Sequence, residues 1–185
     1  MSHFSISNLA NQLGSNKVII SNLRKTHPRW NVKDVLKKTG IKKLYLSDKN
    51  EDVLNLSIRS CKKTLKNFDK KKIDCVIAVT QTAKNKLPSV SCMIQDKLNL
   101  RKNIIAFDVG LGCSGFVYAL AIINSLLNSN TAKTALLVCS DTYSKFLNDQ
   151  NRTCRTIFSD AASSCIVQKF NSNENIEFCF LTDGS

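Results

Sequence analysis

The stretch FDVGLGCSGF, residues 107–116, decides the fold class. It completes the apolar run IIAFDV, residues 104–109, which predicts a buried strand. It also begins an apolar run that predicts a helix from about Cys113 to Leu127. Glycines at 110, 112 and 115 allow a tight turn between the two elements. A strand that passes through such a turn into a helix indicates an α/β protein.

The flanking sequence repeats this alternation of strands and helices. Predicted buried strands cover 73–80 and 135–140, and alternating segments at 164–169 and 176–181 predict two more strands. An amphipathic helix is predicted over 53–68, and a second helix from Ser89, its N-cap, to about Leu98. The pattern predicts a mainly parallel sheet. The helix after Cys113 is apolar on almost all sides, which predicts that it lies inside a domain.

Cys113 is the candidate nucleophile. Free N–H groups and the positive end of the dipole at a helix start favour a thiolate, and they can also stabilise an oxyanion. Gly112 and Gly115 would let a substrate approach the backbone. The other seven of the eight cysteines are interpreted as structural thiols in a reducing compartment. Four of them sit in apolar runs and are expected to be buried, namely Cys75, Cys139, Cys165 and Cys179.

The same glycines support a competing hypothesis. Gly110, Gly112 and Gly115 match the G-x-G-x-x-G pattern of dinucleotide-binding proteins, with Asp141 as the acid that would bind the ribose. That acid follows farther along the chain than the usual spacing of about 20 residues. A dinucleotide-binding oxidoreductase stays an alternative at this point.

Composition limits the class of protein. The chain has 185 residues, of which 43% are hydrophobic and 22% charged, as in one globular domain. The apolar run 116–123 is much shorter than the ~20 residues that span a bilayer, and the N-terminus does not resemble a secretory signal. We therefore expect a cytoplasmic protein with no membrane partner. With only two histidines and no Cys-x-x-Cys pair, no metal site is expected.

Positive charge is concentrated in the first third of the chain. Residues 1–72 hold 17 Lys and Arg against 5 Asp and Glu, a net of +12, whereas residues 73–185 hold 10 against 9, a net of +1. Such a region can attract nucleic acid, anionic lipid or an acidic protein. Because no aromatic-rich nucleic-acid motif accompanies the charge, it is interpreted as a solvated face and no nucleic acid is expected.

Several segments together resemble the N-terminal half of a known family. They follow one another in the family's order, and they are Lys38-Thr-Gly-Ile41, Leu87-Pro-Ser89 with Met93-Ile-Gln95, Ala106-Phe-Asp-Val109 with Gly112-Cys-Ser-Gly-Phe116, Asn151-Arg152, Phe158-Ser-Asp160-Ala and Asp183-Gly-Ser185. The family is β-ketoacyl-acyl carrier protein synthase III, whose members are thiolase-fold condensing enzymes. The resemblance covers nearly the whole chain.

The resemblance implies a fold and an activity. Residues 1–185 would form one half of a duplicated thiolase-like architecture, with a five-stranded mixed sheet and a buried nucleophile helix. The enzyme would transfer an acyl group from acyl-CoA to Cys113 and then condense it, with decarboxylation, with malonyl-acyl carrier protein. Coenzyme A thioester is a substrate here, and no resident cofactor is implied. The implied partners are acyl carrier protein and a second subunit of a homodimer.

The resemblance also implies roles for three further residues. Arg152 matches a basic residue that contacts the coenzyme A nucleotide, and Lys38 stands where the family often has an arginine of similar role. Leu87 replaces an aromatic residue that closes the acyl pocket of the neighbouring subunit, which predicts a longer or branched acyl group.

The chain also departs from the family's pattern. Ser159, Ala161 and Ser163 replace glycine or alanine near the active-site floor, and His3 and His27 match no catalytic position. The family's catalytic histidine and asparagine belong to a second half that this chain lacks. The alternative is therefore a catalytically incomplete domain that binds a partner.

Overall fold

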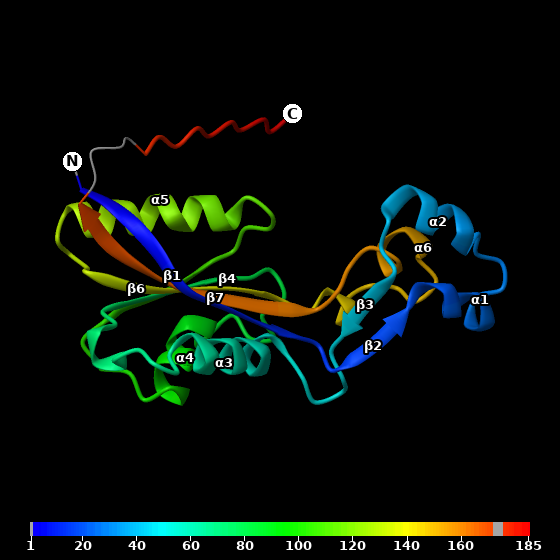
Figure 1. Ribbon diagram of the computed structural model, residues 1–185, viewed down its shortest axis with the longest axis horizontal. Coiled ribbons are helices and arrows are strands. Elements are labelled where there is room, and N and C mark those ends of the chain that lie inside the picture. Colours follow the sequence, from blue (N-terminus) through cyan, green and yellow to red (C-terminus); the bar gives the residue numbers. More distant parts are fainter. Residues whose placement is uncertain (1, 172–175) are drawn as a thin grey trace.

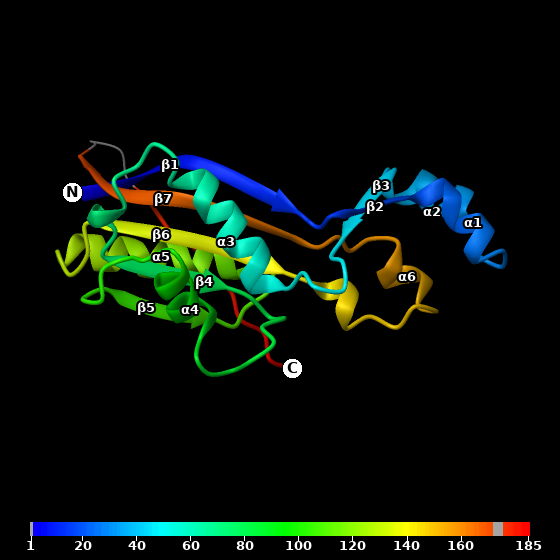
Figure 2. The ribbon, with the colours of Figure 1, turned by 90° about the horizontal axis from the view of Figure 1, so that it is seen from below.

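The fold consists of a central sheet with helices on both faces and a smaller lobe at one end (Figure 1). This computed structural model describes residues 2–171 and 176–185. Helix α5 (Gly115–Asn128) covers one face of the sheet, and α3 (Val53–Thr64) and α4 (Val90–Lys97) cover the other (Figures 1 and 2). The lobe contains the two-stranded sheet of β2 (Asn16–Ile19) and β3 (Lys43–Leu46), with α1 (Leu23–Thr26), α2 (Val32–Thr39) and α6 (Arg152–Arg155). Short 3-10 turns cover Ile20–Asn22, Lys70–Lys72 and Tyr143–Lys145.

The central sheet is mixed and has five strands, in the order β1-β7-β6-β4-β5. Strand β4 (Cys75–Val79) runs parallel to β5 (Ile105–Val109) and to β6 (Thr134–Asp141). Strand β7 (Ala161–Asn171) is antiparallel to β6 and to β1 (Ser2–Leu13). The predictions of an α/β fold and of a five-stranded mixed sheet are confirmed. The edge strand β5 is half-buried along its length, whereas β4, inside the sheet, is fully buried.

The fifth strand is not the one that the sequence predicted. Residues 176–181 form neither helix nor strand, and the first strand of the chain, β1, takes the fifth place. Strand β7 already pairs with β6 on one side and β1 on the other, so it has no free edge for a following segment. Two aromatic rings instead hold this segment, with Phe178 stacked on Phe4 at 6.4 Å and Phe180 beside Tyr118 at 4.5 Å between ring centroids.

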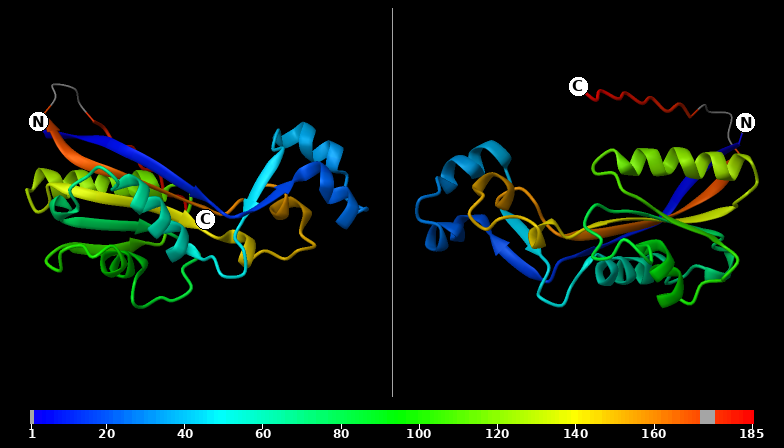
Figure 3. Two further views of the ribbon diagram at one scale, coloured as in Figure 1. Left: turned by 60° about the horizontal axis from the view of Figure 1, so that its bottom comes forward. Right: turned by 180° about the vertical axis from the view of Figure 1, so that it is seen from behind.

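Helix α5 is buried on one side only. Its inner face packs on the sheet through Ala119, Ile123 and Leu127, which are all completely buried. Its outer face leaves Phe116 39% and Val117 43% exposed. Figure 3 shows the helix on one face of the sheet, away from α3 and α4. The described residues pack mainly against one side of the helix, which agrees with the expectation that this chain is one half of a duplicated architecture and by itself leaves part of the helix uncovered. An apolar outer face of this kind marks a surface that another structure can cover.

Helix α3 packs on the opposite face through small polar residues as well as apolar ones. It ends at Thr64, before the predicted end at residue 68, and its buried face includes Ser57, Ser60 and Thr64. The Ser60 hydroxyl contacts the Ser164 hydroxyl of β7 at 2.8 Å, and the Thr64 hydroxyl donates to the Ser164 carbonyl at 3.1 Å. Helix α4 begins after Ser89, whose hydroxyl accepts from the Cys92 N–H, so the predicted N-cap is confirmed.

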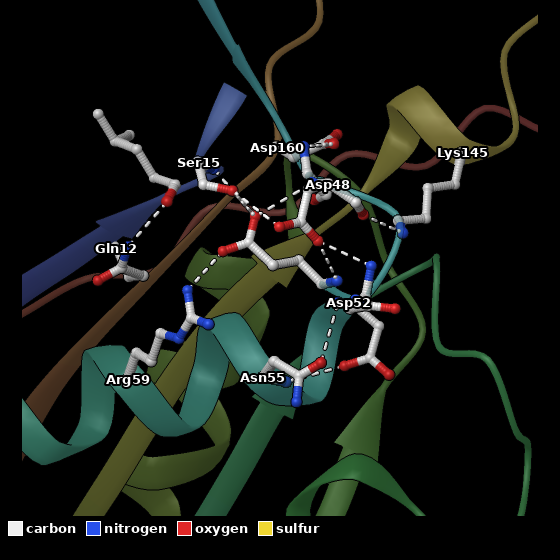
Figure 4. Close-up of polar contacts among 12 residues, drawn as sticks. Gln12, Ser15, Asp48, Asp52, Asn55, Arg59, Lys145 and Asp160 are labelled. Atoms are coloured by element: carbon white, nitrogen blue, oxygen red, sulfur yellow. Dashed lines mark hydrogen bonds and ion pairs between the residues drawn. The ribbon is translucent and has the colours of Figure 1, made fainter. Parts of the chain in front are cut away.

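A buried carboxylate, that of Glu51, joins the lobe to the body of the protein. Figure 4 labels three of its partners, Ser15, Asp48 and Arg59. Glu51, 2% exposed, accepts hydrogen bonds from the Ser15 N–H at 2.9 Å and the Ser15 hydroxyl at 2.7 Å. The Asp48 N–H donates at 3.2 Å, and the Arg59 guanidinium forms an ion pair with the other oxygen. Burial alone would raise the pKa of Glu51, but the hydrogen bonds from Ser15, Asp48 and Arg59 outweigh it and lower the pKa from 4.5 to about 2.

We expect Glu51→Gln to lower the free energy of unfolding by about 1–3 kcal/mol at pH 7, the cost of unsatisfied buried partners. Because the pKa is lowered in the folded state, the carboxylate contributes its full stability above about pH 4.5 and loses it as the pH falls towards 2. Urea unfolding should therefore show a smaller difference between variant and wild type at pH 3 than at pH 7.

The control for this experiment is Asp96→Asn. Asp96 forms an ion pair with Lys97 at 3.4 Å, and both side chains are more than half exposed. Exposed pairs contribute roughly 0–1 kcal/mol, so this variant should unfold almost as the wild type does. Equal losses in the two variants, or a Glu51→Gln loss that does not change with pH, would contradict the argument.

None of the helices in the described residues is long and apolar enough to cross a membrane.

Candidate functional site

Cys113 lies in the turn that connects β5 to α5. The turn is closed by a hydrogen bond from the Gly115 N–H to the Gly112 carbonyl at 2.8 Å. The helix begins at Gly115, so Cys113 precedes the first turn and the predicted start at Cys113 is corrected by two residues. Its side chain is exposed. The thiol therefore lies at the leading end of a helix, where a reagent can reach it.

Glycine is required in this turn by close packing against strand β4. A Cβ at Gly115 would lie 2.4 Å from the Cγ1 of Val79, and one at Gly112 would lie 2.8 Å from the side-chain oxygen of Gln81. Both of these close neighbours, Val79 and Gln81, are residues of the same chain. At Gly115 the space is taken by β4, whereas at Gly112 the close neighbour is the end of a flexible side chain, so the approach of a substrate to the backbone there stays a prediction. The close approach of Gly115 to Val79 fixes the position of Cys113 relative to the sheet.

We expect Gly115→Ala to destabilise the protein by about 1–3 kcal/mol, because the new methyl group overpacks against the buried Val79. The loss should appear although alanine is the better helix former. Gly110→Ala is the control, since a Cβ there would meet no heavy atom within 4 Å. Urea unfolding of the two variants provides the comparison, and a loss in Gly110→Ala as large as in Gly115→Ala would contradict the packing argument.

A cleft of about 390 Å³ opens beside Cys113. It lies at the carboxyl ends of β4 and β6. Figure 2 shows that this end of the sheet faces the lobe. Parallel strands place their carboxyl ends at one edge, which is the usual position of a binding site in α/β proteins. The lining residues are Val79, Gln81, Gly112, Cys113, Phe116, Cys139, Ser140, Asp141, Tyr143 and Phe158. A second, almost wholly apolar cavity of about 210 Å³ shares Phe116 and Cys139 with the cleft and also contains Ser163.

Asp141 holds the loop after β4 against the end of β6. One of its carboxylate oxygens accepts from the N–H groups of Gln81 and Thr82, at 2.8 and 3.0 Å, and from the hydroxyls of Thr80 and Thr82, at 3.1 and 2.8 Å. In the dinucleotide-binding hypothesis this carboxylate would bind a ribose. Here it is occupied by the protein, and β6 is separated from β5 by β4 in the sheet. The arrangement does not support dinucleotide binding.

Two further aspartates position the elements around the cleft. Asp108, on β5, accepts from the N–H groups of Val90 and Ser91 at 2.7 and 2.8 Å and so fixes the start of α4. Asp160 is completely buried and accepts from the Ser47 N–H at 2.7 Å and the Ser144 N–H at 2.9 Å. It thereby joins the lobe to the turn that carries Tyr143. Both aspartates belong to the family-like segments of the sequence, but the sequence predicts no role for either of them.

Burial separates the cysteines into two groups. It raises the pKa of Cys61, Cys75 and Cys139 to about 12 and that of Cys165 to about 11, so these thiols stay protonated at neutral pH. Cys92, Cys113 and Cys179 are exposed, and Cys154 is half-buried. The predicted burial is therefore confirmed for Cys75 and Cys165 and wrong for Cys179, whose segment lies outside the sheet. Cys139 is half-buried because it lines the cleft.

The other predicted site residues lie outside the cleft. Lys38, on α2, and Arg152, the first residue of α6, are both exposed in the lobe, and Lys38 forms an ion pair with Asp34 at 3.1 Å. Leu87 is 85% exposed in the loop between β4 and α4. Tyr143 and Gln81, which do line the cleft, were not among the predicted residues. Gln81 follows a predicted strand, which is the usual place for such a residue, whereas nothing local in the sequence points to Tyr143.

Comparison with known proteins relates the chain to one family. The family model for 3-oxoacyl-[acyl-carrier-protein] synthase III matches residues 107–184. The chain is 35% identical over 162 residues to the β-ketoacyl-[acyl-carrier-protein] synthase III of Acholeplasma laidlawii, covering 85% of this chain and 51% of that protein. It is 38% identical over 132 residues to a Clostridium perfringens protein of the same name, covering 70% of this chain and 40% of that protein.

Solved structures show the same likeness. A crystal structure of a 3-oxoacyl-(acyl-carrier-protein) synthase III superposes with a TM-score of 0.88 at 31% identity, covering 92% of this chain and 51% of that one. A 3-oxoacyl-(acyl-carrier protein) synthase from Burkholderia xenovorans gives 0.85 at 26% identity, covering 93% and 51%. The chain thus spans about half the length of the relatives it matches.

Proposed function

We propose that this chain, which is similar along 85% of its length to β-ketoacyl-[acyl-carrier-protein] synthase III, is the N-terminal half of an acyltransferase of that type. In the proposed reaction the Cys113 thiolate attacks the carbonyl carbon of an acyl-CoA thioester, and the coenzyme A thiolate leaves. The acyl group, now on the sulfur, is then condensed with malonyl-acyl carrier protein as carbon dioxide is lost. No resident cofactor is needed, since the coenzyme A thioester is a substrate.

One observation supports the first step above all others. Cys113 is exposed beside a cleft at the leading end of α5, the longest helix of the described residues, and four of the other cysteines are kept protonated by burial. Thiols at helix N-termini are the common location of reactive cysteines, because the dipole and the free N–H groups stabilise the thiolate. The same groups favour the oxyanion that forms when a thioester is attacked.

The proposal assigns substrate contacts to the exposed cations of the lobe. Arg152 and Lys38 would contact the phosphates of coenzyme A, which guanidinium and ammonium groups bind through charge-assisted hydrogen bonds. Leu87 would reach the acyl pocket of a neighbouring subunit, and its 85% exposure in this chain leaves it free to do so. The net charge of +12 over residues 1–72 suits an acidic acyl carrier protein as partner. We further propose a homodimer, and a cytoplasmic location stays a prediction.

A second candidate function is that of a pairing domain, inactive by itself. The apolar outer face of α5 and the half-length match to its relatives favour this view. Both proposals share the expectation that condensation needs residues outside this chain, since the described residues that line the cleft include no histidine. They differ in whether Cys113 accepts an acyl group.

Mass spectrometry tests the proposed function. The protein that contains this chain and its second half is incubated with acetyl-CoA, digested and mapped for an acetyl group on the peptide that carries Cys113. Acetylation at Cys113 supports the acyltransferase, and a fully folded protein that never acquires the group would overturn it. The substitution that makes this test decisive is considered in the Discussion.

A further inference from the structure

Positive charge from four separate segments meets at one edge of the central sheet. Strand β4 runs parallel to β5 and to β6, so the segments that precede these three strands lie at the same edge, at the amino ends of the strands. Strand β7 is antiparallel to β6, so its last residues reach that edge too. Figure 1 shows this edge at the end of the protein that lies away from the lobe. The exposed cations there, which together form the basic edge, are Lys70, Lys71, Lys72, Arg101, Lys102, Lys133 and Lys169.

Hydrogen bonds join the loops of the basic edge into one surface. The Lys70 ammonium group donates to the Leu98 carbonyl at 3.0 Å, between the loops that precede β4 and β5. The Arg101 guanidinium group donates to the Ile73 carbonyl at 3.2 Å, between the same two loops. The two loops are therefore held in fixed positions relative to each other.

The carboxylates of these loops are already engaged by the backbone. Asp69 accepts from the Lys71 N–H at 3.0 Å, and Asp74 accepts from the N–H groups of Lys133 and Thr134 at 2.9 and 3.0 Å. None of the seven cations forms an ion pair with a carboxylate of the residues that the structure describes. Seven cations against these two carboxylates leave a net charge of +5. Like charges gathered at one edge repel one another unless a partner neutralises them.

The chemistry of the basic edge indicates what kind of partner it fits. Six of the seven cations are lysines, whose ammonium groups are point charges on flexible stems and suit a diffuse negative surface. Phe170 follows Lys169 at the end of β7 and is 54% exposed. An exposed aromatic ring next to lysines is typical of protein surfaces that lie in the interface of a bilayer. There the ring contacts the acyl boundary, and the ammonium groups stay among the lipid headgroups.

We propose that the basic edge docks the protein on the surface of an anionic lipid bilayer. Clusters of roughly four to eight basic residues bind anionic leaflets in this way, through the negative surface potential. The cleft beside Cys113 lies at the carboxyl ends of β4 and β6, opposite the basic edge. In the docked protein the cleft therefore faces away from the membrane and stays open to soluble substrates.

This proposal replaces the expectation of no membrane partner. That expectation was drawn from the lack of a segment long enough to span a bilayer, and docking on the surface needs no such segment. The proposal also goes beyond the interpretation of the charge as a feature of the first third of the chain, since four of the seven cations lie beyond residue 72. It does not depend on the proposed acyl transfer, because it concerns the opposite end of the sheet.

The experiment measures how the protein that contains this chain and its second half sediments with lipid vesicles. We expect binding to vesicles of phosphatidylcholine mixed with phosphatidylglycerol, little binding to phosphatidylcholine alone, and a loss of binding at high salt. The test variant combines Lys71→Gln, Lys102→Gln and Lys133→Gln, one cation from each loop. All three side chains are exposed. Because each cation near an anionic bilayer changes the partition constant by about fivefold, this variant should bind about a hundredfold more weakly.

The matched control removes the same net charge from the lobe. It combines Lys33→Gln, Lys37→Gln and Lys42→Gln, which are exposed too, and it should bind the vesicles almost as the wild type does. Phe170→Ser should weaken binding by a smaller factor than the test variant, at low salt as well as at high salt, because it removes an apolar contact and no charge. Circular dichroism shows whether each variant is folded.

Alkylation of Cys113 by iodoacetamide reports how the docked protein is oriented. Its rate should be the same with and without anionic vesicles, because the cleft lies at the end of the sheet that faces away from the membrane. Slower alkylation of the bound protein would mean that the cleft faces the lipid and would overturn the proposed orientation.

Three further results would overturn the proposal. The first is an equal loss of binding in the two triple variants, because net charge and not the basic edge would then be responsible. The second is equal binding to vesicles with and without phosphatidylglycerol. The third is a DNA duplex that binds more tightly than the anionic vesicles and loses its affinity in the test variant, which would assign the basic edge to nucleic acid.

Discussion

Cys113→Ala is expected to abolish acyl loading by the complete enzyme. The substitution removes the sulfur atom that carries the acyl group in the proposed first step. Among the described residues, Cys139 is the other cysteine that lines the cleft. It cannot take over this role, because it is half-buried and burial raises the pKa of its thiol to about 12. Loss of a nucleophile costs enzymes several orders of magnitude in rate. The acetyl group seen on the Cys113 peptide of the wild type should be absent from every peptide of the variant.

Alkylation of the wild-type chain provides an independent measurement of the same thiol. With iodoacetamide at neutral pH we expect Cys113 to react faster than the other seven cysteines. Cys92 and Cys179 are the matched comparison, since they are exposed too but do not precede a long helix. If the three exposed thiols reacted equally, accessibility alone would govern their reactivity and the activation of Cys113 would be refuted.

Condensation is expected to be absent from this chain alone. Incubation with acetyl-CoA and malonyl-acyl carrier protein should give no β-ketoacyl product, because carbanion stabilisation in the proposed reaction needs a histidine and an asparagine outside residues 1–185. His27 belongs to the lobe, where its ring stacks on Trp30 at 3.9 Å, and His3 belongs to β1. Product release can be followed by mass spectrometry of the carrier protein.

The positive control adds the second half, either as a separate chain or in one continuous protein. Product should then appear, and it should disappear again in Cys113→Ala. This result would support the acyltransferase, whereas acyl loading without product in the continuous protein would favour the pairing domain. Turnover by residues 1–185 without any addition would refute the need for a second half.

Local patterns carried most of the information about the body of the fold. Three parallel strands, helices α3 and α4 and the βα turn around Cys113 all appear close to their predicted positions. Apolar β-branched runs and a serine N-cap act over a few residues, so sequence spacing is enough to detect them. The same holds for the candidate nucleophile, because its position between a strand and a helix is a local property.

Long-range contacts decided the rest. The segment 176–181 has a strand-like sequence, but β7 had no free edge to offer it, and the long strand β1 took that place. The roles of Gly112 and Gly115 depend on Val79 and Gln81, which belong to another strand and its loop. The half-exposed state of α5 depends on which surfaces are present to cover it.

The sequence alone thus determined the α/β class, the thiolase-like half and the cysteine at the leading end of a helix. Only the tertiary structure showed that Tyr143 and Gln81, 62 positions apart, share a hydrogen bond beside that cysteine. Periodicity and caps report on neighbours along the chain, whereas a cleft is made by residues that meet only when parallel strands align their carboxyl ends.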